Sequence, residues 1–263
     1  MSDYDILMHR IRQAERRSRY IRVKEIGKVR YKSKLYKIIR IRVSKPGKRR
    51  YKACFSAGVH GNEDFAIESF LEFLAFLTGS TGDAYGLRQA EISRVLDDFQ
   101  LIAYLFNPIG YDRKIRTNGR RQDLNRWFGK AGAPAEVRAV TKDIGSRRFD
   151  LFIDLHGDRF QNMFYLYERT RLAVSLARKI IQAEKRHRIS VQASYRYGRE
   201  KISYGIINDP KYLHTFDDYM FYEKQVPVCL VLEYGGRIED ESDIKAMLIA
   251  QVQALIGYVK LKN

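Results

Sequence analysis

The sequence lacks several features that mark particular classes of protein. It holds only two cysteines and five prolines in 263 residues, and it contains no low-complexity tract. It has no unbroken run of about 18 or more apolar residues, so we expect no membrane span. No proline-rich or low-complexity linker divides the chain, and we therefore expect one domain over residues 1–263.

The N-terminus and the cysteines give an expectation about location. The first 22 residues lack the apolar core and small-residue cleavage site of a secretory signal. Within residues 1–19, Ile6, Leu7 and Ile11 are spaced as on a surface helix. Cys54 and Cys229 lie in apolar, strand-like runs, so we expect both to be buried and reduced, although spacing alone leaves a disulfide open. These features favour a cytoplasmic protein.

Acidic residues are fewer than basic residues in this chain. The chain has 31 Asp and Glu against 49 Lys and Arg, which gives a net charge of +18. Such a charge suits contact with nucleic acid or another polyanion, but it also suits an ordinary, well-solvated basic surface. No recognisable nucleic-acid module accompanies the basic residues, so the second interpretation is favoured.

Apolar periodicity predicts alternating strands and helices, with breaks at Gly27 and at Pro46-Gly47. This alternation indicates a single-domain, three-layer α/β sandwich around a mixed, mostly parallel central sheet. The first three strands follow one another without a helix, so part of the sheet should be antiparallel. Strands are predicted at residues 20–25, 31–43, 52–59, 99–106, 149–155 and 226–232, and helices at residues 65–77, 134–145, 171–186 and 252–259.

Polar side chains follow three of the predicted strands. His60 and Glu63 come after the third strand, His156 after the fifth, and Glu233 after the sixth. If these strands are neighbours, their carboxyl ends bring the four side chains into one crevice. Two histidines and a carboxylate are a ligand set of catalytic zinc, and a further carboxylate could act as general base. A histidine at a strand end is more often structural, so spacing alone leaves both interpretations open.

The segments between these residues strengthen the case. The chain resembles the zinc carboxypeptidase family and its relatives, the murein peptide amidases and the succinylglutamate desuccinylase/aspartoacylase group. The resemblance covers about residues 50–236, and its most specific part is Asp-Leu-Asn-Arg at 123–126 followed by Phe128. The matching segments are HGNE (60–63), NPIGYDRKIRTNGRRQDLNRWF (107–128), DLHG (154–157) and LEYG (232–235).

The resemblance implies a site with one Zn²⁺ per chain. His60, Glu63 and His156 would bind the metal, and Glu233 would activate the zinc-bound water. Asp123 would orient His60 from behind and fix its tautomer.

The resemblance also implies residues that bind the substrate. Asn125 and Arg126 would hold a free carboxylate, a task that suits the planar fork of arginine. Arg116 would polarise the scissile carbonyl and stabilise the oxyanion. Arg113 is the rival for that role, because the segment can also be aligned with the longer enzymes.

The chain departs from the family pattern in two places. Many members carry a tyrosine roughly twenty residues before the catalytic glutamate, and here Tyr212, Tyr219 and Tyr222 all lie in that interval without a clear choice. The common DLNRNF reads DLNRWF, and we expect Trp127, the only tryptophan, to be a packing residue.

Three functions follow, in order of preference. The first is a zinc metallocarboxypeptidase that hydrolyses the C-terminal amide bond of a small peptide with a free carboxylate, by attack of zinc-bound water assisted by glutamate. The second is an N-acyl-amino-acid amidohydrolase, of the desuccinylase or deacylase type, on the same scaffold. The chain ends about thirty residues after Glu233, which slightly favours the peptidase. The third is a basic polyanion-binding protein with a relict metal site, against which the joint presence of ligands and base argues.

Overall fold

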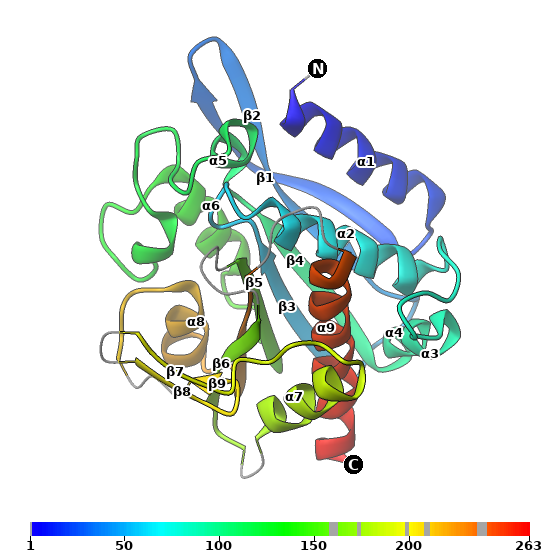
Figure 1. Cartoon of the computed structure of the whole chain (residues 1–263). Helices are drawn as coiled ribbons and strands as arrows, with labels where there is room; N and C mark the ends of the chain where they lie inside the picture. The colour runs from blue at the N-terminus through cyan, green and yellow to red at the C-terminus, as the bar shows by residue number, and fades with distance from the viewer. Residues whose placement is uncertain (1, 158–162, 173–174, 198–199, 208–210, 236–240) are drawn as a thin grey trace.

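The computed structural model describes the chain except for residues 1, 158–162, 173–174, 198–199, 208–210 and 236–240 (Figure 1). Its strands form one sheet in the order β1-β2-β4-β3-β5-β10-β6-β9-β8-β7. The strands are β1 (Ile21–Tyr31), β2 (Lys34–Val43), β3 (Tyr51–Ala57), β4 (Phe99–Leu105), β5 (Leu151–Gly157), β6 (Phe164–Thr170), β7 (Ser194–Tyr197), β8 (Glu200–Ser203), β9 (Ile206–Ile207) and β10 (Val228–Tyr234). The helices are α1 (Asp3–Arg17), α2 (Asp64–Thr78), α3 (Gln89–Ser93), α4 (Val95–Asp98), α5 (Pro108–Arg113), η1 (Leu124–Arg126), α6 (Ala135–Ile144), α7 (Leu176–Arg186), α8 (Phe216–Asp218), η2 (Tyr219–Glu223) and α9 (Glu241–Lys262).

The predicted mixed α/β sandwich is confirmed: most of its parallel pairs lie at the centre, and β6 and β9 form a further parallel pair. Strands β4, β3, β5 and β10 are parallel neighbours. Antiparallel pairs flank them, namely β1–β2 and β2–β4 on one side and β10–β6, β7–β8 and β8–β9 on the other. Because β3, β5 and β10 run in one direction, their carboxyl ends open at the same edge of the sheet.

Alternating side chains of the central strands build two apolar layers. Phe55 and Ile153 point to the face covered by α2, α7 and α9. Their neighbours Cys54 and Phe152 point to the other face, beneath α6 and α8. The period of two in a strand therefore places one core on each side of the sheet. Cys54 is buried and unpaired, and so is Cys229, as we predicted.

The predicted break at Gly27 is wrong. Gly27 lies inside β1, where the register with β2 shifts between Glu25 and Gly27. A Cβ at this position would lie 2.7 Å from the Cβ of Ala139 in α6, so a glycine lets the helix pack closely on the strand. The chain reverses instead after Tyr31, at Lys32, whose φ is 51°.

The second half of the chain contains strands that periodicity did not reveal. The helix predicted at 171–186 begins only at Leu176, after strand β6. Glu168 of β6 accepts the backbone N–H groups of Leu176 (2.8 Å) and Ala177 (3.0 Å), which fixes the start of α7. The loop predicted at 198–210 contains β8 and β9, although residues 198–199 and 208–210 lie outside the described chain.

Helix α9 is long and apolar enough, between Asp243 and Lys262, to cross a membrane by length and composition. Among the described residues it is the one helix that meets this test. It packs against α2 and α7, and most of the apolar stretch is buried within the protein (Figure 1). It therefore has the burial of a core helix, and the candidate span is weak.

Candidate metal and active site

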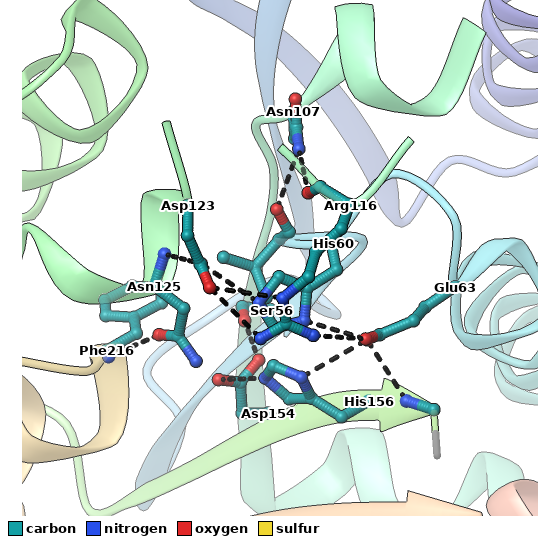
Figure 2. Close-up of polar contacts among 12 residues, drawn as sticks. Ser56, His60, Glu63, Asn107, Arg116, Asp123, Asn125, Asp154, His156 and Phe216 are labelled. Atoms are coloured by element: carbon teal, nitrogen blue, oxygen red, sulfur yellow. Dashed lines mark hydrogen bonds and ion pairs between the residues drawn. The ribbon is translucent and has the colours of Figure 1, made fainter. Parts of the chain in front are cut away.

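Two neighbouring strands bring the predicted metal ligands together. In the sheet, β3 pairs with β5 up to Ala57 and Leu155, where β3 ends, while β5 continues to Gly157 beside β10. His60 stands three residues beyond the end of β3, and His156 stands next to the end of β5. Their ring centroids are 5.0 Å apart. Glu63 immediately precedes α2, and its carboxylate contacts both rings (Figure 2).

The three side chains form a set that can hold one metal ion. Their ligand atoms lie within 4.8 Å of one another, and His60, Glu63 and His156 are only 3–4% exposed. The Nδ1 atom of His60 lies 2.8 Å from Glu63 Oε1, and the Nδ1 atom of His156 lies 3.3 Å from Oε2. Two imidazole nitrogens and one carboxylate facing a common point are donors that fit catalytic zinc.

Each histidine is held at its far nitrogen by a second carboxylate. The Nε2 atom of His60 lies 3.1 Å from Asp123 Oδ1, and that of His156 lies 3.0 Å from Asp154 Oδ2. A carboxylate at Nε2 leaves Nδ1 to serve as the ligand atom. We predicted contact of Asp123 with His60 but overlooked Asp154. The spacing of Asp154 and His156 could have indicated this contact, because residues two apart on a strand share a face.

The site is strongly charged in the metal-free protein. Burial favours neutral Glu63, but hydrogen bonds from His156 and His60 outweigh this effect and lower its pKa to about 2. Burial also opposes a charge on His156, yet Asp154 and Glu63 raise its pKa well above the ordinary value. Likewise, the pKa of Asp123 is depressed by His60 and Arg116 in spite of its burial. A metal ion that bound the Nδ1 atom of His156 would therefore compete with a proton there.

Glycine contacts hold the His60 turn against the segment that follows β4. A Cβ on Gly61 would lie 1.9 Å from the carbonyl carbon of Gly110, so only glycine fits there. Asn107 donates from Nδ2 to the backbone oxygens of Val59 (2.9 Å) and Arg116 (3.3 Å). It also accepts the N–H of Gly110 at 3.0 Å. One asparagine thus connects the turn to the loop that carries Arg116.

Gly157, directly after His156, has a similar constraint. Its N–H donates to Glu63 Oε2 at 3.1 Å. A Cβ there would lie 2.2 Å from Cε1 of Phe65 and 3.3 Å from Cγ of Glu63. The glycine therefore allows α2 to approach β5 closely enough for Glu63 to reach both histidines.

The two rival arginines lie in different places. Arg116 approaches Glu63 Oε1 at 3.5 Å with Nη1, and it contacts Asp123 Oδ2 through Nε (3.2 Å) and Nη2 (3.1 Å). Arg113 stacks its guanidinium over the ring of Tyr31, 4.8 Å from the centroid. The structure therefore brings Arg116, rather than Arg113, against the metal ligands (Figure 2).

The presumed carboxylate anchor borders the same cluster. Asn125 is buried, and its Oδ1 accepts the N–H of Phe216 at 2.9 Å, so its amide nitrogen remains to donate elsewhere (Figure 2). Arg126 is exposed, donates to the backbone oxygen of Asn125 at 2.7 Å, and forms no ion pair with any described carboxylate.

Glu233 is level with His156 at the end of β10. The two residues are register partners in parallel strands, so their side chains project from the same face of the sheet. Glu233 is half-buried there. The sheet thus places a further carboxylate on the side of the metal ligands.

The three candidate tyrosines belong to two aromatic groups. Tyr212 donates to Glu223 at 2.7 Å and packs against Tyr222, with 5.6 Å between ring centroids. Tyr219 packs against Phe128 at 5.9 Å. The structure gives no reason to assign any of them to the metal site.

The comparisons with known proteins agree with this geometry. The family model described as zinc carboxypeptidase matches residues 8–252. The chain belongs to the zinc carboxypeptidase family. No curated protein sequence matches it.

Solved structures share its fold at low sequence identity. A candidate metallopeptidase from Shewanella baltica has a TM-score of 0.76 and 18% identity, over 97% of this chain and 92% of that one. A metallo-carboxypeptidase from Burkholderia cenocepacia has a TM-score of 0.70 and 20% identity, over 98% and 68%. The metallo-carboxypeptidase from Pseudomonas aeruginosa, in complex with (2-guanidinoethylmercapto)succinic acid, has a TM-score of 0.65 and 18% identity, over 97% and 68%.

Gly157→Ala should weaken metal binding. The added methyl group would displace Phe65 and Glu63, so we expect a loss of affinity on the order of tenfold and about 1–3 kcal/mol of stability. Chelator competition and thermal unfolding measure the two effects. Gly82→Ala is the control, because a Cβ there meets nothing within 4 Å. Equal zinc affinity in both variants would contradict the role of this contact.

Zinc affinity should fall as the pH is lowered. His156, whose pKa is raised, gains a proton at low pH, and that proton competes with the metal. Loss of one proton per metal predicts about a tenfold weaker affinity for each pH unit below that pKa. Titrations between about pH 7 and pH 5.5 in chelator buffers measure the slope. A flat profile over that range would show that no proton is displaced.

Proposed function

We propose that this protein is a zinc-dependent metallocarboxypeptidase that binds one Zn²⁺ per chain and cleaves the C-terminal amide bond of small peptides. The observation that carries the proposal is the position of both Nδ1 atoms of His60 and His156, which face Glu63 beside Arg116. That arrangement combines three metal ligands with a cation for a developing negative charge. Membership of the zinc carboxypeptidase family supports it.

Glu233 is proposed to move the proton. Bound zinc supplies a Lewis acid that polarises a carbonyl group and makes water a better nucleophile. Glu233, on the same face as His156, takes a proton from the attacking water and passes it to the leaving amine.

Arg116 is proposed to stabilise the tetrahedral oxyanion. Its side chain is 46% exposed while it contacts Glu63 and Asp123, so part of the guanidinium remains accessible to a substrate. Its hydrogen-bond donors would strengthen their interaction as the carbonyl oxygen gains charge.

Asn125 and Arg126 are proposed to bind the substrate carboxylate. The link from Phe216 to Asn125 Oδ1 leaves the amide N–H groups as donors, and Arg126 brings a charge without an ion pair among the described residues. The ligand named for the Pseudomonas aeruginosa metallo-carboxypeptidase is a succinic acid derivative, which carries carboxylates. Both groups would position the substrate and leave the chemistry to Glu233 and the metal.

An N-acyl-amino-acid amidohydrolase would use the same anchor, since its substrate also ends in a carboxylate.

Polyanion binding is the weaker alternative. Its support is the net charge and the exposed Arg120 and Arg121, which form no ion pair with a described acidic residue. A cytoplasmic location stays a prediction.

Glu233→Gln should keep the metal and lose turnover. The amide retains the shape of the side chain but cannot accept the proton, so we expect kcat to fall by about 10²–10⁴-fold with near-stoichiometric zinc. The assay uses C-terminal peptides, muramyl-type peptides and N-acyl amino acids, which also separates peptidase from deacylase. Glu91→Gln, in an exposed pair with Arg88, is the control. Full activity in Glu233→Gln would rule out this mechanism.

Arg126→Gln should raise KM more than it lowers kcat. Loss of a charged hydrogen bond to the substrate carboxylate costs about 1.5–3 kcal/mol, which corresponds to tenfold or more in KM. Added salt should raise the KM of the wild-type protein and have less effect on the variant. Steady-state kinetics at two ionic strengths test this, with the exposed Arg178→Gln as control. An unchanged KM would place the anchor elsewhere.

A further inference from the structure

Behind the His156 ring, on the side away from the metal ligands, lies a buried pair of polar residues. Ser56 of β3 and Asp154 of β5 are register partners, and both are 0% exposed. The hydroxyl of Ser56 donates to Asp154 Oδ1, while Asp154 Oδ2 lies 3.0 Å from His156 Nε2 (Figure 2). A continuous path of hydrogen bonds thus runs from β3 to the His156 ring.

We propose that Ser56 is a positioning residue of the zinc site, which acts through Asp154 to fix the orientation and tautomer of His156. This role rests on the proposed zinc site but not on the identity of the substrate. Neither Ser56 nor Asp154 touches the presumed metal position, because Nδ1 of His156 is the nitrogen that faces Glu63.

The first argument is the cost of the buried carboxylate. Asp154 is enclosed between the sheet and the apolar layer beneath α6 and α8, where an ionised group is tolerated only if its oxygens receive hydrogen bonds. Among the described side chains it receives one bond on each oxygen, from Ser56 and from His156. With Oδ1 satisfied by Ser56, Oδ2 is directed at the imidazole. Without the hydroxyl of Ser56, Oδ1 of Asp154 would lose its hydrogen-bond donor, and rotation of the carboxylate would lower its free energy.

The second argument concerns the tautomer. A carboxylate only accepts hydrogen bonds, so the nitrogen that faces Asp154 must carry the hydrogen. In neutral His156 the lone pair then lies on Nδ1, toward Glu63 and the metal position. A rotated Asp154 would lose this selection, and the ring could tilt or exchange tautomers.

The two histidines are held in different ways. Asp123, behind His60, stands in a loop, is 26% exposed, and also binds Arg116. Asp154 stands inside a paired strand and is fixed by a second strand through Ser56. We infer that the His156 side of the site is the rigid one, and that Ser56 contributes to this rigidity.

The test compares Ser56→Ala with Ser56→Thr, which restores a hydroxyl group. Ser69→Ala is the matched control, because Ser69 is also fully buried but donates only to Ala66 O of its own helix at 3.0 Å. Zinc affinity is measured by chelator competition, the ligand geometry by the visible spectrum of the Co²⁺-substituted protein, and folding by thermal unfolding of metal-free protein.

We expect Ser56→Ala to lose about 10–100-fold in zinc affinity and to change the Co²⁺ spectrum. Ser56→Thr should recover most of the affinity, and Ser69→Ala should match wild type. If Ser56→Ala does not fold, Ser56→Cys takes its place. Its thiol is a weak donor, so its affinity should also fall.

Wild-type zinc affinity and spectrum in Ser56→Ala, or in Ser56→Cys where that variant replaces it, would overturn the positioning role, even if thermal stability fell. A wild-type protein that bound no zinc would overturn the metal site and the positioning role together. A wild-type protein that bound zinc with Ser56-dependent affinity, yet cleaved nothing in the substrate panel, would overturn only the proposed peptidase.

Discussion

The carboxylate of Glu63 is the group on which the site's arrangement depends. It is buried, and it contacts His60, His156, the Gly157 N–H and Arg116, which come from three separate parts of the chain. In metal-free protein these contacts offset the cost of burying its charge. The same contacts hold both imidazole rings with Nδ1 toward one point. The fold can therefore keep the ligand geometry before a metal enters, and a cation would replace the proton that His156, with its raised pKa, shares with Glu63.

Acidic groups lie in the interior around this carboxylate, and basic groups lie nearer the surface. The chain as a whole carries +18, yet the groups behind the histidines are the acids Asp123 and Asp154. Arg116 and Arg126 lie further out and are partly or largely exposed. An acidic interior favours a metal cation, whereas a basic rim favours an anionic substrate. Part of the positive charge therefore lies around the proposed substrate position.

The sequence predicted the parts of the site that follow a change of pattern. The apolar, strand-like run before His60 and the period-3.6 run after Glu63 predicted a strand-to-helix turn for both residues, where the structure has them. The order of the strands could not be read in this way, because β4 inserts between β2 and β3 through pairing distant in sequence. The sequence did not predict strand β6 for a related reason. Its extended conformation depends on pairing with β10 and β9, which are distant in sequence.

Ser56 and Asp154 show a second limit of the sequence. Each is a polar residue in an apolar strand. The two are 98 positions apart, and this spacing does not predict a contact between them. Only the register of β3 with β5 makes them partners. The choice between Arg113 and Arg116 had the same character. The resemblance allowed both and favoured Arg116, and the structure has the guanidinium of Arg116 in contact with Glu63 and Asp123.

The segment from Asn107 to Arg126 carries four of the residues assigned to the site, namely Arg116, Asp123, Asn125 and Arg126. It holds the partner of His60, the proposed oxyanion arginine and the proposed carboxylate anchor, and it is fixed to the His60 turn by backbone contact between Gly61 and Gly110. Contacts between backbones cannot relax by a change of rotamer, so a shift of this segment would move these groups together relative to β5 and β10. The proposed roles of Arg116, Asn125 and Arg126 therefore depend on the close packing of the Gly61 backbone on Gly110.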